Sequence, residues 1–342
     1  PRFTCVINLI MNLFILKKLR KLFKSLGKYE YKILDKITLL ENKKQNKIKN
    51  ITLDDNKFLQ IEKNLSNPLF EPKKISIVIC FHYNKKRIKN LIKICKNISS
   101  YRFSKDVSII TNNINNKQSK FFKKQINKKL KKYSLVKIKN NPEPNLLPWY
   151  CLNFMKKKYK DKSFSHFLYL EDDILINSRN INYWIYCRKI LKSYNLIPAF
   201  LRCEIVNKNL ISVDNQKKIK IKNTPKILSS TKKYGFLNMR YPYHGACFMD
   251  RNLMNEYSKS NLIGIDYGSH HKIMKMLYPV KELANIIIGY INVPKGYYNR
   301  FFIPFINSNK IPIYCTIKHL DNKYSKDKTS YFGKIKVENL LN

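Results

Sequence analysis

Three consecutive carboxylates, Glu171, Asp172 and Asp173, directly follow the apolar run from Phe167 to Leu170. They stand out in a chain of 342 residues that has a formal net charge of +46 and only 22 acidic residues. Neighbouring carboxylates repel one another, and this destabilises the fold unless a cation neutralises them. Mg²⁺ and Mn²⁺ prefer carboxylate oxygens as ligands. The triplet therefore predicts a divalent cation site, and the alternative is a group of acids at the N-terminus of the next helix.

The elements that must position these acids alternate between apolar runs and helical patterns. Near-continuous apolar runs of this length are typical of parallel strands buried on both faces. We predict strands at 75–80, 106–113, 135–138, 167–170 and 199–206, and helices at 88–98, at 121–130 and from a cap at Asn180. Strand, helix and strand in about 40 residues form a βαβ unit with a right-handed crossover. The predicted fold class is α/β, a mostly parallel sheet between helices, with an irregular and mixed part after residue 207.

Polar side chains follow three of the predicted strands. His82 and Tyr83 come after the first strand, Asn112 after the second, and the acidic triplet after the fourth. Ligands of open α/β sheets bind beyond the carboxyl ends of the strands. We therefore expect these residues to line one crevice, either as ligand contacts or as ordinary rim residues.

The composition limits the class of protein. A hydrophobic content of 44% with 13% aromatic residues is enough for a packed core, which excludes a mainly disordered chain. Ten of the 68 basic residues are arginine, and the abundance of Lys, Asn and Ile is what an AT-rich coding sequence produces. The positive charge still favours anionic partners. The eight cysteines are scattered without a CxxC pair, which predicts a reducing, cytoplasmic setting without zinc cluster or disulfide framework.

The N-terminal segment 11–27 predicts a basic amphipathic helix, because leucines recur at three- and four-residue steps between Lys and Arg. Such a helix docks either on its own domain or on an anionic membrane surface. The apolar stretch 3–16 is too short to span a membrane, which takes about 20 residues. Met11 is a candidate start, so residues 1–10 are expected to lie upstream of it. We expect residues 1–27 to form this helix, 28–72 a connector with one helix, 73–330 the main domain and 331–342 a tail.

Four segments in this order resemble the family A glycosyltransferases that build bacterial cell-surface glycans. The segments are ISIVICFHYN (75–84), FLYLEDDILI (167–176), YPYHGACFMD (241–250) and IKHLDNKY (317–324). The resemblance covers roughly residues 73 to 325. It implies a Rossmann-like fold, with a nucleotide-binding half at 73–175 and an acceptor half at 176–330. It also implies transfer of a sugar from a nucleoside diphosphate sugar to a glycan or lipid-linked acceptor, with Mn²⁺ or Mg²⁺, by a cytoplasmic enzyme peripheral to the inner membrane surface.

The resemblance also implies roles for the acids and for a late histidine. Asp173 would ligate the metal, and His319 would complete the site, although a lone histidine is more often structural. Asp172 would support the metal or bond the ribose, and Glu171 would lie beside the nucleotide. Lys323, like Lys326, would place positive charge near the diphosphate. His82, Tyr83 and Asn112 would face the base and ribose, and Tyr83 would stack on the base.

The resemblance further implies an acceptor side and a base. Asp266 is the candidate catalytic base for the acceptor hydroxyl, and Asp250 is the second candidate. The Glu-Asp pair usual in inverting members is absent, which leaves a retaining mechanism open. Gly245 would let the backbone approach a sugar, and His244 would contact a hydroxyl. Trp149 would stack on a sugar ring, or it is a core residue.

Two other classes of function remain open at this stage. A metal-dependent nuclease or phosphoryl-transfer enzyme also uses acids at a strand end, and Glu204 on the strand 199–206 offers a further one. A basic nucleic-acid or membrane-surface binder is the other class. We expect no nucleic acid as a partner, because Arg is scarce and the aromatic residues lie in apolar runs. The sequence does not identify the sugar, the nucleotide, the acceptor or the oligomeric state.

Overall fold

The computed structural model describes residues 51–66, 71–139, 147–215, 217–239, 245–259, 288–289, 291–328, 330 and 332–342. All the elements below belong to one compact unit, formed by residues 50–265 and 280–342. The predicted helix 11–27, His244 and Asp266 lie outside the described residues. None of the helices described here is both long and apolar enough to cross a membrane.

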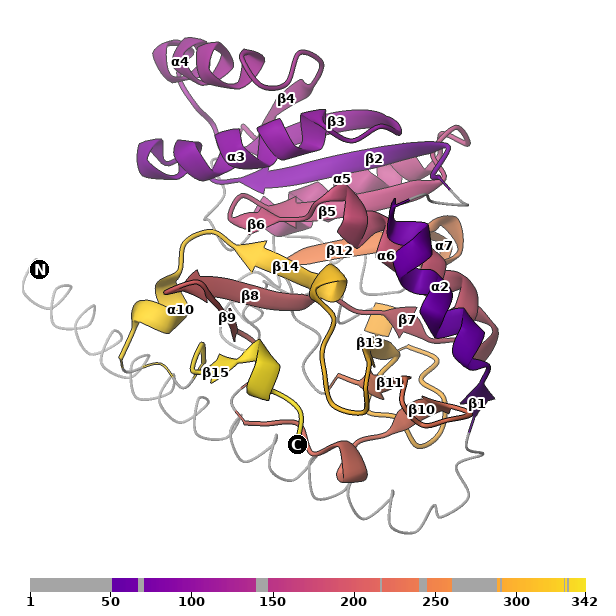
Figure 1. Cartoon of the computed structure of the whole chain (residues 1–342). Helices are drawn as coiled ribbons and strands as arrows, with labels where there is room; N and C mark the ends of the chain where they lie inside the picture. The colour runs from indigo at the N-terminus through magenta and orange to yellow at the C-terminus, as the bar shows by residue number, and fades with distance from the viewer. Residues whose placement is uncertain are drawn as a thin grey trace, which may run out of the picture. The chain divides into compact units, whose positions relative to one another are not determined.

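The first sheet contains the strands that the apolar runs predict. Strands β2 (Lys74–Phe81), β3 (Ser104–Thr111), β4 (Ser134–Lys137) and β5 (His166–Glu171) are parallel, and β12 (Ala246–Asp250) is antiparallel to β5 at one edge. The order is β12-β5-β2-β3-β4, which can be followed in Figure 1. The predicted α/β class with a mostly parallel sheet is confirmed.

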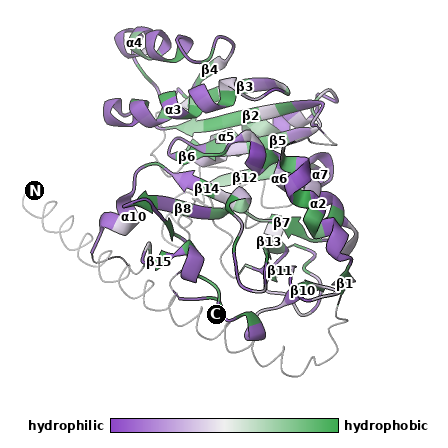
Figure 2. Ribbon diagram, viewed as in Figure 1, coloured by the Kyte–Doolittle hydropathy of each residue, from purple (hydrophilic) through white to green (hydrophobic). Residues whose placement is uncertain are grey.

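The central strand β2 shows why these residues form a doubly covered sheet. Ile75 to Phe81 are all buried, and in Figure 2 the strand is drawn largely in the hydrophobic colour. Along the chain, the parallel strands alternate with the helices α3 (Ile88–Ser99), α4 (Asn116–Asn127) and α5 (Leu147–Tyr159). Each buries apolar residues that recur at helical spacing.

The register of the first sheet aligns the carboxyl ends of its strands. Cys80 of β2 pairs with Glu171 of β5, and Phe81 of β2 pairs with Thr111 of β3. The segments that follow these strands, which hold His82, Asn112 and the acidic triplet, therefore begin at one edge of the sheet.

A second sheet brings the C-terminal part of the chain to the same place. It contains β6 (Ile174–Leu175), β8 (Leu201–Val206), β9 (Asn209–Ser212), β14 (Thr316–His319) and β15 (Ile335–Lys336), in the order β15-β9-β8-β14-β6. Strand β14 pairs with β8 in parallel and with β6 in antiparallel orientation, and His319 lies opposite Ile174. The predicted strand 199–206 therefore belongs to this sheet rather than to the first.

A third sheet and the remaining helices complete the unit. The sheet has the order β1-β10-β11-β13-β7, with strands at Thr52–Leu53, Lys226–Ser229, Gly235–Asn238, Phe301–Phe305 and Ile197–Pro198. The other α-helices are α2 (Asp55–Ser66), α6 (Ser178–Leu191), α7 (Arg251–Lys259) and α10 (Lys323–Lys326). The 3₁₀ turns are η1 (Lys85–Arg87), η2 (Lys192–Tyr194), η3 (Ile221–Asn223), η5 (Ile313–Cys315) and η6 (Val337–Asn339).

The start of α6 corrects one prediction and excludes one alternative. The N-cap is Asn177 rather than Asn180, and the two asparagines form a reciprocal capping box. Asn180 also donates from its side chain to the carbonyls of Tyr314 and Thr316, at 2.7 and 2.9 Å. The acidic triplet therefore does not cap this helix, and its negative charge needs another explanation.

Candidate metal and nucleotide site

Two of the three acids are buried in the turn that joins β5 to β6. Asp172 is 3% exposed and Asp173 is 2% exposed. The carbonyl oxygen of Asp173 accepts a hydrogen bond from the amide of Leu320 at 2.8 Å, just after β14. This bond ties the acidic turn of one sheet to the histidine-bearing strand of another.

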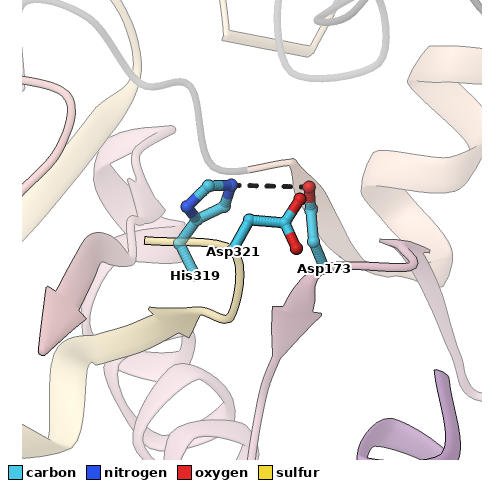
Figure 3. A group of neighbouring side chains, drawn as sticks. All are labelled: Asp173, His319 and Asp321. Carbon is cyan, nitrogen blue, oxygen red and sulfur yellow. Dashed lines mark ion pairs between the residues drawn. The ribbon is translucent and has the colours of Figure 1, made fainter. Parts of the chain in front are cut away.

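His319 stands between two carboxylates at the end of β14. Its Nε2 lies 3.4 Å from Asp173 Oδ2, and its Nδ1 lies 2.6 Å from Glu204 Oε1 on β8 (Figure 3 shows the side towards Asp173). Burial lowers the pKa of His319, but the hydrogen bonds with Asp173 and Glu204 outweigh it and raise the pKa above its usual value. The contact with Glu204 fixes the ring so that Nε2 faces the acidic turn.

Glu204 is held as firmly as the histidine that it orients. Its side chain accepts hydrogen bonds from the amides of Tyr324 at 3.2 Å and Ser325 at 2.7 Å, and the residue is wholly buried. Burial raises its pKa, but the hydrogen bonds from His319 and Ser325 prevail and lower it to about 2. Glu204 therefore stays ionised and keeps His319 Nδ1 protonated.

Asp321 adds a third group beside Asp173 and His319. One ligand atom from each of the three residues lies within 4.8 Å of the others, and Figure 3 shows these side chains converging. Asp321 comes from the turn after β14, and its Oδ1 accepts a hydrogen bond from the side chain of Asn90 on α3. Two carboxylates and one imidazole form a donor set that suits Mn²⁺ or Mg²⁺.

Arg87 of η1 is the positive charge in contact with this cluster. Its Nη2 lies 2.7 Å from Asp172 Oδ1, 2.7 Å from Asp173 Oδ2 and 3.7 Å from Asp321 Oδ2. Lys323 Nζ is further away, 3.9 Å from Asp173 Oδ2.

The two buried aspartates differ in their protonation. Burial raises the pKa of Asp172 well above its usual range, although Arg87 opposes this shift. Burial also acts on Asp173, but the hydrogen bond from His319 and the nearby charges of His319 and Arg87 hold its pKa well below the usual range. Of these two aspartates, Asp173 is therefore ionised more readily and is the stronger candidate ligand.

Several buried polar atoms of the cluster lack a close hydrogen-bond partner. Among the described residues, Asp172 Oδ2 and Asp173 Oδ1 form no hydrogen bond, and His319 Nε2 has only its long contact of 3.4 Å with Asp173 Oδ2. Buried polar atoms are normally paired, so such atoms point to a ligand. They are oxygen and imidazole nitrogen atoms, which fit a divalent cation.

The predicted nucleotide contacts lie at the same sheet edge. Asn112 Oδ1 accepts a hydrogen bond from the amide of Tyr83 at 2.6 Å, which joins the segments after β2 and β3. His82 is partly buried, and burial, with the charge of Arg87 as a smaller cause, lowers its pKa. The amide of Glu171 donates a hydrogen bond to the carbonyl of Gly245 at 2.9 Å, so the segment that begins at Gly245, which the resemblance predicts to face the acceptor, lies beside the triplet.

The position of Gly245 requires a residue without a side chain. Its φ is +60°, and a Cβ there would approach Ile174 Cγ1 to 2.8 Å and Glu171 Oε2 to 3.2 Å. A glycine therefore lets this backbone lie against the acidic turn.

Two predicted site residues are placed elsewhere. Asp250 pairs in register with His166, at the amino end of β5, so it lies about 17 Å along the strand from the acidic turn. It accepts hydrogen bonds from Arg188 at 2.9 Å and from the amide of Leu253 at 2.8 Å, as a cap for α7. In this structure Asp250 therefore lies away from the acidic turn, and Asp266 remains the first candidate for the base. Trp149 is 7% exposed on α5, which agrees with the core alternative.

The sequence analysis did not predict Arg87 or Asp321 as site residues. It named Glu204 only as a further acid for the nuclease alternative. Asp321 follows His319 by two residues, and this spacing was a usable signal for a shared site. Arg87 and Glu204 are far from the triplet in sequence, and only the sheet pairing brings them to it. No local pattern marks either residue.

Among the comparisons with known proteins, only solved structures match this chain. No protein family model matches the chain, and no curated protein matches it. Among solved structures, S. aureus TarS is similar over 54% of this chain and 29% of its own, with 12% identity and a TM-score of 0.33. The mannosyltransferase PcManGT from Pyrobaculum calidifontis, in complex with GDP-Man and Mn²⁺, is similar over 50% of this chain and 44% of its own, with 11% identity and a TM-score of 0.28. The chain thus spans less than half of either protein, and scores this low establish neither a shared fold nor a shared function.

Proposed function

We propose that the protein is a metal-dependent glycosyltransferase that moves a sugar from a nucleoside diphosphate sugar to a glycan or lipid-linked acceptor. The observation that carries the proposal is the convergence of Asp173, His319 and Asp321 at the carboxyl edge of a parallel sheet. That edge is where open α/β sheets bind ligands. The order of the four sequence segments supports the same proposal.

The protein's own residues have distinct tasks in this proposal. Asp173, His319 and Asp321 hold a Mn²⁺ or Mg²⁺ ion, and Asp172 supports them from the same turn. When bound, the ion supplies a positive charge that stabilises the departing diphosphate. Glu204 keeps the lone pair of His319 Nε2 directed at the ion, as carboxylates behind metal-binding histidines commonly do.

The donor's nucleoside and diphosphate lie along the edge formed by β2, β3 and β5. His82, Tyr83 and Asn112 face the base and the ribose there, and Glu171 lies beside them. Lys323 reaches toward the cluster from α10 with a charge complementary to a diphosphate.

The acceptor enters on the side of Gly245, where the backbone closely approaches Glu171. His244 precedes this glycine in sequence and is proposed to contact an acceptor hydroxyl. Asp266 is the proposed base, which would make the enzyme inverting. A retaining mechanism is the alternative if Asp266 is dispensable.

In the part of the chain that the structure describes, Glu204 does not support the nuclease alternative. That alternative uses Glu204 as an additional acid for metal binding, but the carboxylate of Glu204 is occupied by His319 and by the amides of Tyr324 and Ser325. Glu204 therefore acts on the histidine rather than on a ligand.

A transfer assay with a panel of nucleotide sugars tests the proposal. The purified chain is expected to hydrolyse or transfer from one UDP- or GDP-sugar, and only with Mn²⁺ or Mg²⁺ present. Asp173→Asn removes a ligand charge and is expected to abolish this activity. Asp161→Asn is the matched control, because Asp161 is exposed in the connection between α5 and β5. Full activity in Asp173→Asn, or cleavage of nucleic acid without action on any nucleotide sugar, would contradict the proposal.

A further inference from the structure

A dense group of lysines lies on α4 and the turn that follows it, at residues 116–132. Eight of these 17 residues are lysine and none is acidic. The average lysine content of the chain would place about three there. All eight side chains are exposed, namely Lys117, Lys120, Lys123, Lys124, Lys128, Lys129, Lys131 and Lys132.

The helix packs through one face and leaves the other to solvent. Ser119, Phe122 and Ile126 are buried, and the ring of Phe122 stacks on Phe81 of β2 at 5.5 Å. Hydrophilic purple covers much of α4 in Figure 2. The exposed face therefore is not needed to hold α4 on the sheet.

Phe121 lies in the middle of that exposed face. It is 39% exposed, and it is one of four large hydrophobic side chains exposed in the part of the chain that the structure describes. Lys117 and Lys124 are four residues before it and three after it, so they share its side of the helix. Lys85 of η1 also places its Nζ 5.9 Å from the centre of the ring.

We propose that this surface docks on an anionic lipid membrane. We call it the α4 basic face, and it consists of Lys117, Lys120, Phe121, Lys124 and Lys128. Lysine ammonium groups are attracted by anionic lipid headgroups, while their long stems and one aromatic ring reach the boundary with the acyl chains.

A second surface helix shows that an exposed apolar residue alone does not make such a face. On α2, Leu59 is 55% exposed, more than Phe121. Its helix carries Asp55 and Glu62 together with Lys57 and Lys63, so the charges nearly cancel. Among the helices that the structure describes, α4 alone combines an exposed ring with uniform positive charge, and this combination suits a membrane surface.

The chemistry of the face favours lipid over nucleic acid. No arginine occurs from residue 103 to 178. Arginine is the side chain that most often forms bidentate hydrogen bonds with bases and phosphates. Proteins that bind single strands track the backbone in a groove, whereas this surface is one outward helix face.

The α4 basic face is linked to the candidate site through η1. Lys85 contacts Phe121, and Arg87 of the same turn contacts the acidic cluster. Docking would thus hold the site close to the membrane, which suits a lipid-linked acceptor. Only that last point rests on the proposed function, because the docking itself does not require it.

Vesicle sedimentation of the full chain tests the charge. Wild-type protein is expected to bind phosphatidylcholine vesicles that contain phosphatidylglycerol and not vesicles of phosphatidylcholine alone. Replacing Lys117, Lys120, Lys124 and Lys128 by Gln should weaken this binding on the order of 1,000-fold, since each lysine near the surface contributes roughly a fivefold gain in affinity. The control replaces four exposed lysines elsewhere, Lys57, Lys63, Lys217 and Lys218, with the same change in net charge. The control should keep most of the binding.

Tryptophan fluorescence tests the insertion of the ring. The chain has two tryptophans, and both are buried, so a Phe121→Trp variant carries one exposed reporter. Its emission should shift to the blue with the anionic vesicles, whereas a Leu59→Trp variant on α2 should not respond.

Three outcomes would overturn the proposal. These are equal losses in the two four-lysine variants, unchanged vesicle binding in the α4 variant, and α4-dependent binding to single-stranded RNA without vesicle binding. The vesicles contain no nucleotide sugar, so failure of the proposed transferase activity would leave these results unaffected.

Discussion

Arg87 and a divalent cation need the same carboxylate oxygens. The guanidinium Nη2 lies 2.7 Å from both Asp172 Oδ1 and Asp173 Oδ2, and Asp173 is the central member of the candidate metal set. A guanidinium and a metal ion repel each other, so both are not expected to keep full contact with Asp173. Arg87 is 34% exposed in its side chain, which leaves it a path toward solvent or toward a diphosphate.

Arg87→Gln is therefore expected to tighten Mn²⁺ binding. The ion would no longer compete with a charge-assisted hydrogen bond, and we expect a gain of about tenfold in affinity, or about 1.4 kcal/mol. Calorimetric titration with MnCl₂ at fixed pH and salt measures it. Lys86→Gln makes the same change in net charge one residue away, and no described ion pair involves Lys86, so it serves as control. Weaker binding in Arg87→Gln would show that Arg87 supports the metal ligands instead.

Glu204→Gln tests the positioning of His319. The amide keeps the shape of the side chain but removes the charge that holds His319 Nδ1 protonated. Loss of such a partner typically weakens metal binding about 10- to 100-fold, and we expect that range for Mn²⁺. Glu338→Gln is the control, because the side chain of Glu338 is 66% exposed and the residue lies more than 100 positions after Glu204 in the sequence. An affinity equal to wild type would leave Glu204 with only a structural role.

For single residues, the sequence indicates the candidate metal ligands more readily than the residues that contact and orient those ligands. Asp173 could be predicted because adjacent acids after an apolar strand are a local signal, and His319 entered through the resemblance alone. Arg87 and Glu204 could not be predicted. Their roles depend on side-chain contacts across 86 and 115 residues of sequence, and a lone Arg or Glu is unremarkable in any window.

Among the elements, α6 is important because it connects the strands that carry the site. Asn180 belongs to the capping box of α6 and also donates to two carbonyls next to β14. These bonds hold His319's strand against the helix that follows the acidic turn.

Asn180→Ala is expected to destabilise the fold more than a simple cap mutation does. Truncation leaves the carbonyls of Tyr314 and Thr316 buried without this donor, so we expect a loss of about 2–4 kcal/mol in the free energy of unfolding. Gln118→Ala is the matched control. It removes the equivalent member of the exposed capping box of α4 and should cost about 1 kcal/mol. Urea denaturation measures both, and equal losses would refute a linking role for Asn180.

The apolar pattern of the sequence predicts which segments form strands but not which strands pair with each other. Apolar runs predicted the strands of the first sheet, because burial on both faces requires such runs. The run at 199–206 predicted a strand equally well but not its sheet. Strand β8 pairs in parallel with β14, whose residues are more than 100 positions away. Periodicity indicates that a strand exists, and the partner is decided by packing of the whole unit.

Across the described part of the molecule, a chain with a net charge of +46 gathers the buried acids Asp172, Asp173 and Glu204 around Arg87 and His319. Asp173, His319 and Asp321 reach one point from two strand ends of different sheets. The proposed enzyme therefore requires a cation at this point and a nucleotide that binds after it.

Calorimetric titration with Mn²⁺, followed by GDP or UDP, tests this dependence most directly. We expect one Mn²⁺ site in the wild-type chain, and binding of a nucleoside diphosphate that is at least about tenfold tighter with Mn²⁺ than without it. Asp173→Asn should remove both effects, while Asp161→Asn should retain them. Nucleotide binding that is indifferent to Mn²⁺, or an Asp173→Asn chain that binds Mn²⁺ as wild type does, would contradict the account.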